Sequence, residues 1–244
     1  MLNAHTRGDF TLLKKKATPK AKTVRDIPRY ERAEASINLN EKQNEAYRNI
    51  LEPDSISVIY GEAGVGKTIS GIYAGFKLLK MRQISRIILT RPTVEVGRSM
   101  GFLPGEMEEK YMPYLMPFKD FCTLLGNSGE ATFDSMMVTK QIVPAPLQFL
   151  QGLTFTETDL VILDEAQNAT REEISMVLGR MKEGSRLVIN GDTAQKMTKR
   201  NESNGLALSL HLSTKLEYIK AFELTENKRH PRIREIMKTI EEHE

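Results

Sequence analysis

The chain has 244 residues, enough for one large α/β domain, and none of its apolar runs approaches the roughly eighteen residues that a membrane-spanning helix needs. Its lone cysteine, Cys122, excludes an internal disulfide, and one cysteine with four scattered histidines offers no paired ligands for zinc. A net charge of +3 neither requires nor excludes a nucleic-acid partner, and an N-terminus without an apolar signal core predicts a cytoplasmic protein.

Positive charge is concentrated at the start of the chain, where nine lysines and arginines lie between residues 7 and 32 with few acidic residues among them. This stretch has little apolar periodicity, so we expect a flexible N-terminal arm over residues 1–37 and a single folded domain over residues 38–244. Two interpretations of the arm stay open. It is either a solvated tail or a segment that binds the phosphates of a nucleic acid without reading its sequence.

The folded part is expected to begin with a helix that Asn38 or Asn40 can cap. The pair Pro53-Asp54 then turns the chain, and the apolar run Ser55–Tyr60 follows as the first strand. This strand leads directly into the most informative motif of the sequence.

That motif is a complete phosphate-binding loop of the pattern G-x-x-x-x-G-K-[ST]. Its residues are Gly61, Glu62, Ala63, Gly64, Val65, Gly66, Lys67 and Thr68. Glycines let the backbone N–H groups turn toward phosphate oxygens, and the helix predicted over residues 68–81 adds its positive N-terminal end. Lys67 is suited to contact the β- and γ-phosphates, and the Thr68 hydroxyl is suited to hold Mg²⁺. The loop therefore predicts that the chain binds ATP or a close relative.

Beyond the loop, short β-branched strands alternate with helical patterns. Further strands are predicted at residues 86–90, 141–143, 160–163, 186–190 and 221–224, and further helices at 105–125, 171–182, 205–212 and 231–242. Nearly continuous apolar strands separated by helices are typical of a parallel sheet that is covered on both faces. We therefore predict an α/β fold in which phosphates bind at the carboxyl ends of the strands.

Polar residues follow two of these later strands. Asp164 is suited to hold Mg²⁺, and the adjacent Glu165 is suited to polarise a water molecule for attack on the γ-phosphorus. The alternative for Glu165 is a charge at the N-terminus of a helix. Gln195 ends the segment Gly191–Gln195, where its amide can contact the γ-phosphate or the attacking water, unless the segment is only a polar turn. A carboxylate beside the metal ligand favours hydrolysis over transfer to a small acceptor, which argues against a small-molecule kinase.

The segment Thr90–Glu106, TRPTVEVGRSMGFLPGE, resembles the signature of the PhoH family, phosphate-starvation-type P-loop ATPases of bacteria and phages. The phosphate-binding loop, the acidic motif with its extension to Asn168, the Gly191–Gln195 segment and the closing Lys228–Pro231 are similar to that family's motifs in the same order. The resemblance covers about residues 38 to 240. It implies a P-loop NTPase with a RecA-like parallel sheet, similar to the first half of superfamily 1 helicases.

The chain departs from the family pattern at two places. Arg98 replaces the acid usual in the signature segment, and Lys196–Thr198 replaces an apolar and acidic stretch. Both departures bear on contacts with partners or nucleic acid rather than on ATP chemistry.

The resemblance assigns roles to two residues that the pattern alone leaves open. Gln43 matches a glutamine that reads the adenine edge, whereas its position alone suggests the surface of the first helix. Arg229 matches a late arginine that neutralises γ-phosphate charge in the transition state; the alternative is a surface or capping arginine. Arg91 lies just beyond a strand end and is expected to face either nucleotide or nucleic acid.

The resemblance also implies hexamers, in which each subunit covers its neighbour's nucleotide site. Segment 91–125, rich in Gly, Pro and Met, is the candidate for ring contacts or for a central nucleic-acid loop. Two functions stay open. The first is an ATPase stimulated by single-stranded RNA or DNA, of the RNA helicase or remodeller type, working with an RNA-processing protein. The second is an ATP-dependent oligomeric switch that recruits a protein partner and moves no strand.

Overall fold

The structure is a computed structural model that describes residues 37–92, 130–193 and 204–226, with further helical positions at 112, 115, 116, 118–121, 232, 235, 236 and 239. The basic arm predicted over residues 1–37 lies outside this part of the chain except for Ile37. The division into an arm and one domain therefore stays a prediction.

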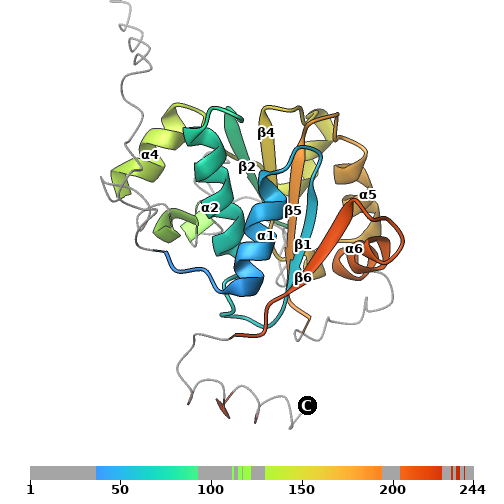
Figure 1. Cartoon of the computed structure of the whole chain (residues 1–244). Helices are drawn as coiled ribbons and strands as arrows, with labels where there is room; N and C mark the ends of the chain where they lie inside the picture. Colours follow the sequence, from blue (N-terminus) through green and yellow to red (C-terminus); the bar gives the residue numbers. More distant parts are fainter. Residues whose placement is uncertain are drawn as a thin grey trace, which may run out of the picture.

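Six parallel strands form one sheet in the order β3-β2-β4-β5-β1-β6 (Figure 1). The strands are β1 (Ile56–Tyr60), β2 (Arg86–Thr90), β3 (Ile142–Pro144), β4 (Asp159–Leu163), β5 (Arg186–Gly191) and β6 (Ile219–Glu223). This arrangement confirms the predicted α/β fold, a RecA-like parallel sheet with helices on both faces. The strand β5 lies between β1 and β4, so the ends of these three strands are neighbours.

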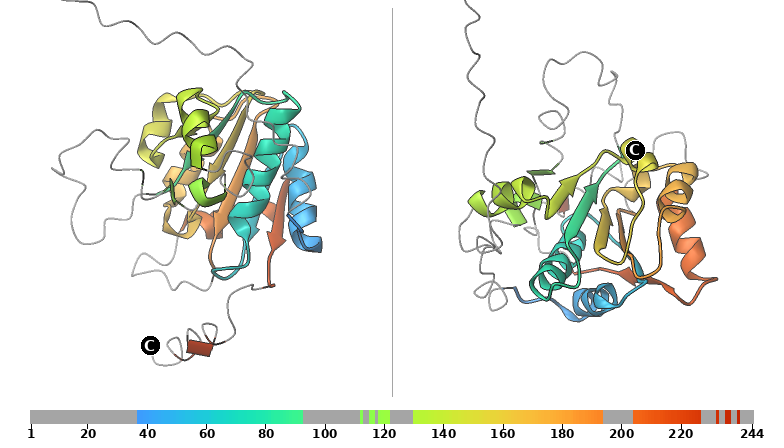
Figure 2. Two further views of the ribbon diagram at one scale, coloured as in Figure 1. Left: turned by 90° about the vertical axis from the view of Figure 1, so that its left-hand side faces the viewer. Right: turned by 90° about the horizontal axis from the view of Figure 1, so that it is seen from above.

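Helices cover both faces of the sheet (Figures 1 and 2). They are α1 (Glu41–Leu51), α2 (Lys67–Lys80), α4 (Glu130–Val138), α5 (Arg171–Leu178) and α6 (Gly205–Ser213), with the short 3₁₀ helices η3 (Leu147–Gly152) and η4 (Ala166–Asn168). Seen from above in Figure 2, α1 and α2 lie on one side of the sheet and α5 and α6 on the other. None of the helices in the described ranges combines the length and the apolar character that crossing a membrane requires.

Alternate residues of each strand supply two separate cores. Ile162 and Val188 point to the core beneath α1, α2 and α4, whereas Val161 and Leu187 point to the core beneath η3, α5 and α6. All four side chains are at most 1% exposed. A shift of any strand by one residue would move its side chains to the opposite face of the sheet. The burial pattern therefore fixes the register that places the candidate site residues at the sheet edge.

Most predicted elements lie within two residues of the observed ones. The helix predicted over 171–182 ends earlier, at Leu178, because the chain beyond it pairs with Phe155, whose N–H donates to the Arg180 carbonyl (2.9 Å) and whose carbonyl accepts from the Lys182 N–H (2.9 Å). The helix α4 and the 3₁₀ helix η3 were not predicted from the sequence. The helix predicted over 231–242 lies largely outside the described residues.

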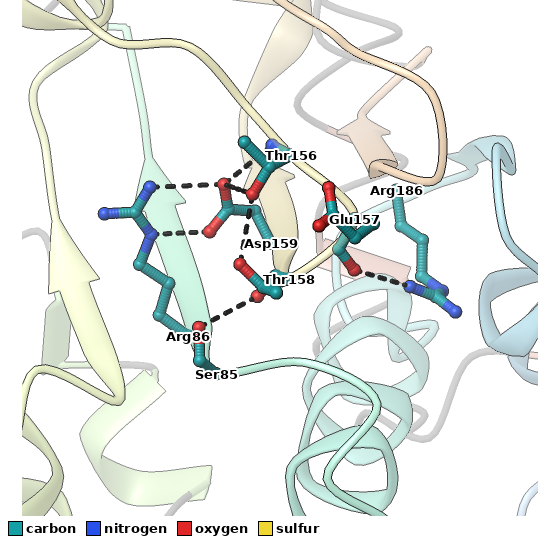
Figure 3. A network of polar contacts seen from close by, with 7 residues as sticks. All are labelled: Ser85, Arg86, Thr156, Glu157, Thr158, Asp159 and Arg186. Carbon is teal, nitrogen blue, oxygen red and sulfur yellow. Dashed lines mark hydrogen bonds and ion pairs between the residues drawn. The ribbon is translucent and has the colours of Figure 1, made fainter.

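A polar network at the amino-terminal edge of the sheet fixes β2 against β4 (Figure 3). The buried Asp159 carboxylate accepts from Arg86 Nε (2.5 Å) and Nη2 (3.2 Å), and also from the Thr156 N–H (2.8 Å) and hydroxyl (3.1 Å). The same pair is in register at the start of the two strands. The network therefore helps to set which residues meet at the opposite, carboxyl-terminal edge.

Candidate nucleotide-binding site

The phosphate-binding loop occupies the turn between β1 and α2, and its glycines are required by backbone geometry. Gly61, Gly64 and Gly66 have φ values of +144°, +92° and +83°. A Cβ atom at Gly61 would overlap the carbonyl oxygen of Leu224, and one at Gly66 would lie 2.5 Å from Gln43 Nε2. Only glycine fits both positions without strain. Gly66 is also the N-cap of α2, so no side chain at the cap position competes with an anionic ligand for the N–H groups of the first turn.

The Lys67 ammonium group lies over the centre of this loop. Its Nζ donates to the carbonyl oxygens of Gly61 (2.6 Å) and Glu62 (2.8 Å) and lies 3.8 Å from Asp192 Oδ2. The loop backbone therefore holds the positive charge at the place where the sequence predicts phosphate.

Asp164 follows β4 and is only 6% exposed. Burial raises the pKa of its carboxyl group, and the charge of Glu165 acts in the same direction, whereas Arg91, a hydrogen bond from the Glu165 backbone and Lys67 lower it. A carboxylate in this position is costly when charged, so a bound cation would compensate it. The carboxylate oxygens of Asp164 and the hydroxyl of Thr68, on the first turn of α2, are hard oxygen donors of the kind that Mg²⁺ prefers.

Glu165 is held by two side chains in a left-handed backbone conformation, with φ +58° and ψ +42°. Its Oε1 accepts from Arg91 Nη2 at 2.5 Å, and its Oε2 accepts from Gln167 Nε2 at 2.5 Å. It occupies the position before η4 but makes no side-chain cap bond to that helix. Its carboxylate is thus engaged with side chains rather than with helix N–H groups.

Gln167 connects the ends of β4 and β5. This side chain is 1% exposed, donates to Glu165 and accepts from the backbone N–H of Asp192 at 2.9 Å. Together with the Lys67–Asp192 contact it forms a continuous polar chain from Arg91 to the phosphate-binding loop. Gln167 and Asp192 both lie within motifs recognised in the sequence, but the sequence alone predicted no role for either.

Gln43 is buried rather than on the surface of α1, so the interpretation as a surface residue is wrong. It is 2% exposed, its Oε1 accepts from the Asn40 N–H at 3.0 Å in a capping box, and its Nε2 donates to the Val65 carbonyl at 3.0 Å. Its amide therefore touches the phosphate-binding loop directly. These two bonds use one N–H and one oxygen lone pair of the amide, and a second N–H and a second lone pair remain. Contact of the amide with adenine stays a prediction.

Several predicted residues lie outside the described part of the chain. They are Gln195, Arg229, Arg98 and most of segment 91–125. Their proposed roles are unchanged by the structure.

The family model described as PhoH-like protein matches residues 36–241. The chain belongs to the PhoH-like family. The PhoH-like protein of Bacillus subtilis (strain 168) is 35% identical over 208 residues, which cover 84% of this chain and 64% of that protein. Protein PhoH of Escherichia coli (strain K12) is 36% identical over 174 residues, which cover 69% of this chain and 48% of that protein. The chain thus spans between about half and two thirds of the length of these family members.

Two solved structures share the general arrangement at low identity. The large terminase of a thermophilic bacteriophage has a TM-score of 0.48 at 10% identity, with 83% of this chain and 50% of that chain covered. The Pif1 helicase from Candida albicans has a TM-score of 0.44 at 15% identity, with 84% and 44% covered. The likeness to both structures is limited to the general arrangement of the chain.

The position of Gln43 allows a test of adenine recognition. We expect Gln43→Ala to lower the preference for ATP over GTP by roughly thirtyfold, because it would remove the two predicted hydrogen bonds between the amide and adenine, of about 1 kcal/mol each. The measurement is kcat/KM for both nucleotides. Asn40→Ala is the matched control, since it removes the cap of α1 and leaves the Gln43 amide in place. Unchanged selectivity in Gln43→Ala would limit this residue to supporting the loop.

Proposed function

We propose that this chain is a Mg²⁺-dependent ATPase whose hydrolysis is coupled to single-stranded nucleic acid, as in an RNA helicase or remodeller. The observation that supports it most directly is the position of the Lys67 ammonium, 2.6 Å from the Gly61 carbonyl and 3.8 Å from Asp192. The strand β4, which leads to Asp164 and Glu165, is separated from β1 by β5 alone. Lys67, the proposed metal ligand Asp164 and the proposed base Glu165 therefore belong to one sheet edge.

Each of these residues has a separate task. Lys67 holds the β- and γ-phosphates by charge, while Thr68 and Asp164 would hold Mg²⁺, which neutralises charge on the phosphates when bound. Glu165 accepts a proton from the attacking water through a carboxylate oxygen. In this proposal Gln195 orients that water, and Arg229 offsets the charge that develops on the γ-phosphate.

The nucleic-acid part of the proposal rests on charge and family resemblance. Nine basic residues between positions 7 and 32 are suited to contact phosphates without sequence preference. A cytoplasmic location and an RNA-processing protein partner belong to the same proposal.

The oligomeric part rests on the single sheet. ATP hydrolysis in helicase-like proteins takes place between two RecA-like walls, and the described residues contain one such sheet. In a homo-oligomeric ring, with six subunits favoured by the resemblance, the second wall and Arg229 come from the neighbouring copy.

One prediction separates phosphate binding from chemistry. We expect Lys67→Ala to abolish ATP binding, because it removes the charge that the loop carbonyls hold in place. We expect Glu165→Gln to retain ATP binding and to lower kcat by roughly 10² or more, because the base acts only during attack. Equilibrium binding of a fluorescent ATP analogue and steady-state hydrolysis measure the two effects. Wild-type turnover in Glu165→Gln would remove the base assignment.

Another prediction distinguishes the nucleic-acid motor from the protein-recruiting switch. We expect an oligouridylate or a matching oligodeoxythymidylate to raise kcat for ATP severalfold, because a coupled ATPase uses contacts made by the strand to complete its site. Lys67→Ala with the same oligonucleotide is the control for contaminating activity. If neither strand changes kcat, the alternative of an ATP-dependent switch is favoured.

The ring can be tested with mixed subunits. We expect Arg229→Ala to lower kcat by about 10³, and a mixture of inactive Arg229→Ala and Lys67→Ala subunits to recover part of the hydrolysis. In mixed rings an intact loop on one subunit meets an intact arginine from the next. Differently tagged chains that co-purify establish subunit exchange. Confirmed exchange without recovered activity would place Arg229 within its own chain.

A further inference from the structure

The side chain of Arg91 is bound to the residue that the proposed reaction needs as its base. Arg91 directly follows β2, which pairs in register with β4, so it lies beside Glu165 although the two residues are 74 positions apart in the chain. Its Nη2 lies 2.5 Å from Glu165 Oε1. Among the described residues this carboxylate is the one hydrogen-bond partner of the Arg91 guanidinium.

Both oxygens of the Glu165 carboxylate are engaged in this arrangement. Arg91 binds one oxygen and Gln167 binds the other. The site as described is therefore arranged against hydrolysis.

The backbone at Glu165 supports the same interpretation. Four described non-glycine residues have positive φ, and three of them, Asp54, Arg82 and Lys140, lie in exposed turns. Glu165 is the fourth, and it is partly buried at the nucleotide site. A left-handed residue of this kind is strained, and contacts such as those of Arg91 and Gln167 keep it in place.

The ion pair is also exchangeable. The side chains of Arg91 and Glu165 are 22% and 28% exposed, so water screens their attraction and the pair is weak compared with a buried one. A phosphodiester group offers Arg91 a better geometry, because guanidinium binds phosphate through two parallel hydrogen bonds. A nucleic-acid backbone that reaches this edge can therefore compete for Arg91.

We propose that Arg91 is a brake on ATP hydrolysis, which holds Glu165 until a phosphate of single-stranded nucleic acid takes the guanidinium. This inference rests on the proposed function, because it names how nucleic acid would control the same site. Arg91 is then a positioning residue that acts through Glu165.

The second contact of Glu165 explains why release leaves the base in place. Gln167 stays bound to Glu165 Oε2 and to the Asp192 N–H, and Asp192 in turn lies beside Lys67. When Arg91 leaves, Oε1 becomes the free acceptor for the proton of the attacking water, while Gln167 keeps the carboxylate next to the phosphate-binding loop. Arg91 thus controls access to Oε1, whereas Gln167 holds Oε2.

The test compares basal and stimulated hydrolysis in Arg91 variants. We expect Arg91→Gln to raise the basal kcat by about fivefold, the factor that a weak ion pair supplies, with KM for ATP unchanged. Stimulation by an oligouridylate should fall toward onefold. Arg91→Lys should lie between wild type and Arg91→Gln, because it retains the charge and loses the planar fork. Mg²⁺ must be saturating, since Arg91 also lowers the pKa of Asp164.

Arg171→Gln is the matched control. Arg171 is the exposed first residue of α5, and its removal lowers the net charge equally without touching Glu165, so both rates should equal those of wild type. Urea unfolding of all variants shows whether each one is folded. Failure of wild type to hydrolyse ATP would reject the proposed function itself. An active wild type with an unchanged or lower basal kcat in Arg91→Gln would overturn the brake alone, and a raised basal kcat with undiminished stimulation would overturn the role of nucleic acid in releasing it.

Discussion

The close fit of the phosphate-binding loop against its neighbours is the constraint on which the nucleotide site depends. The loop backbone passes so near Leu224, at the end of β6, and Gln43, on α1, that no side chain fits at Gly61 or Gly66. The loop is therefore held by an edge strand and by the helix that precedes β1, and not only by β1 and α2. Residues outside the motif therefore help to support the site. Asn40, for example, accepts a hydrogen bond from the N–H of Gln43, whose side chain contacts the loop.

The buried carboxylates at the two edges of the sheet differ in how far the protein balances their charge. At the amino-terminal edge, Asp159 is fully buried and receives four hydrogen bonds from Arg86 and Thr156, so its charge is balanced within the protein. At the carboxyl-terminal edge, Asp164 is nearly as buried, yet burial is the dominant influence and raises the pKa of its carboxyl group. The same residue type thus has its charge balanced at one edge and left costly at the other, and the difference lies in the partners supplied.

Sequence alone predicted the elements that repeat a pattern and the motifs that occupy contiguous residues. β2 was located at residues 86–90 and α2 within one residue, because each combines a strong periodicity with clear boundaries. The helix α4 was not predicted because it is only nine residues long and its position is set by the packing of Phe133 and Met136 into the core. The Arg91–Glu165 contact could not be predicted, since it joins residues 74 positions apart through the β2–β4 register. Burial of Gln43 was missed for a similar reason: its neighbour Val65 belongs to the loop and not to α1.

Polar groups beneath the nucleotide site show that stability was not the only requirement on this edge. Ser70 in α2, Thr90 at the end of β2 and Asn190 in β5 are each at most 1% exposed, and their side-chain polar atoms have no hydrogen-bond partner within the part of the chain that the structure describes. A buried polar group left in this state costs about 1–3 kcal/mol, whereas an apolar residue of similar size would carry no such penalty. The same helix and strands carry apolar residues at equivalent depth further from the loop, including Ile87 and Val188. The carboxyl-terminal edge thus combines buried polar groups, a strained backbone at Glu165 and a buried Asp164 whose charged form is disfavoured. Such a combination is expected where a fold gives up stability for function.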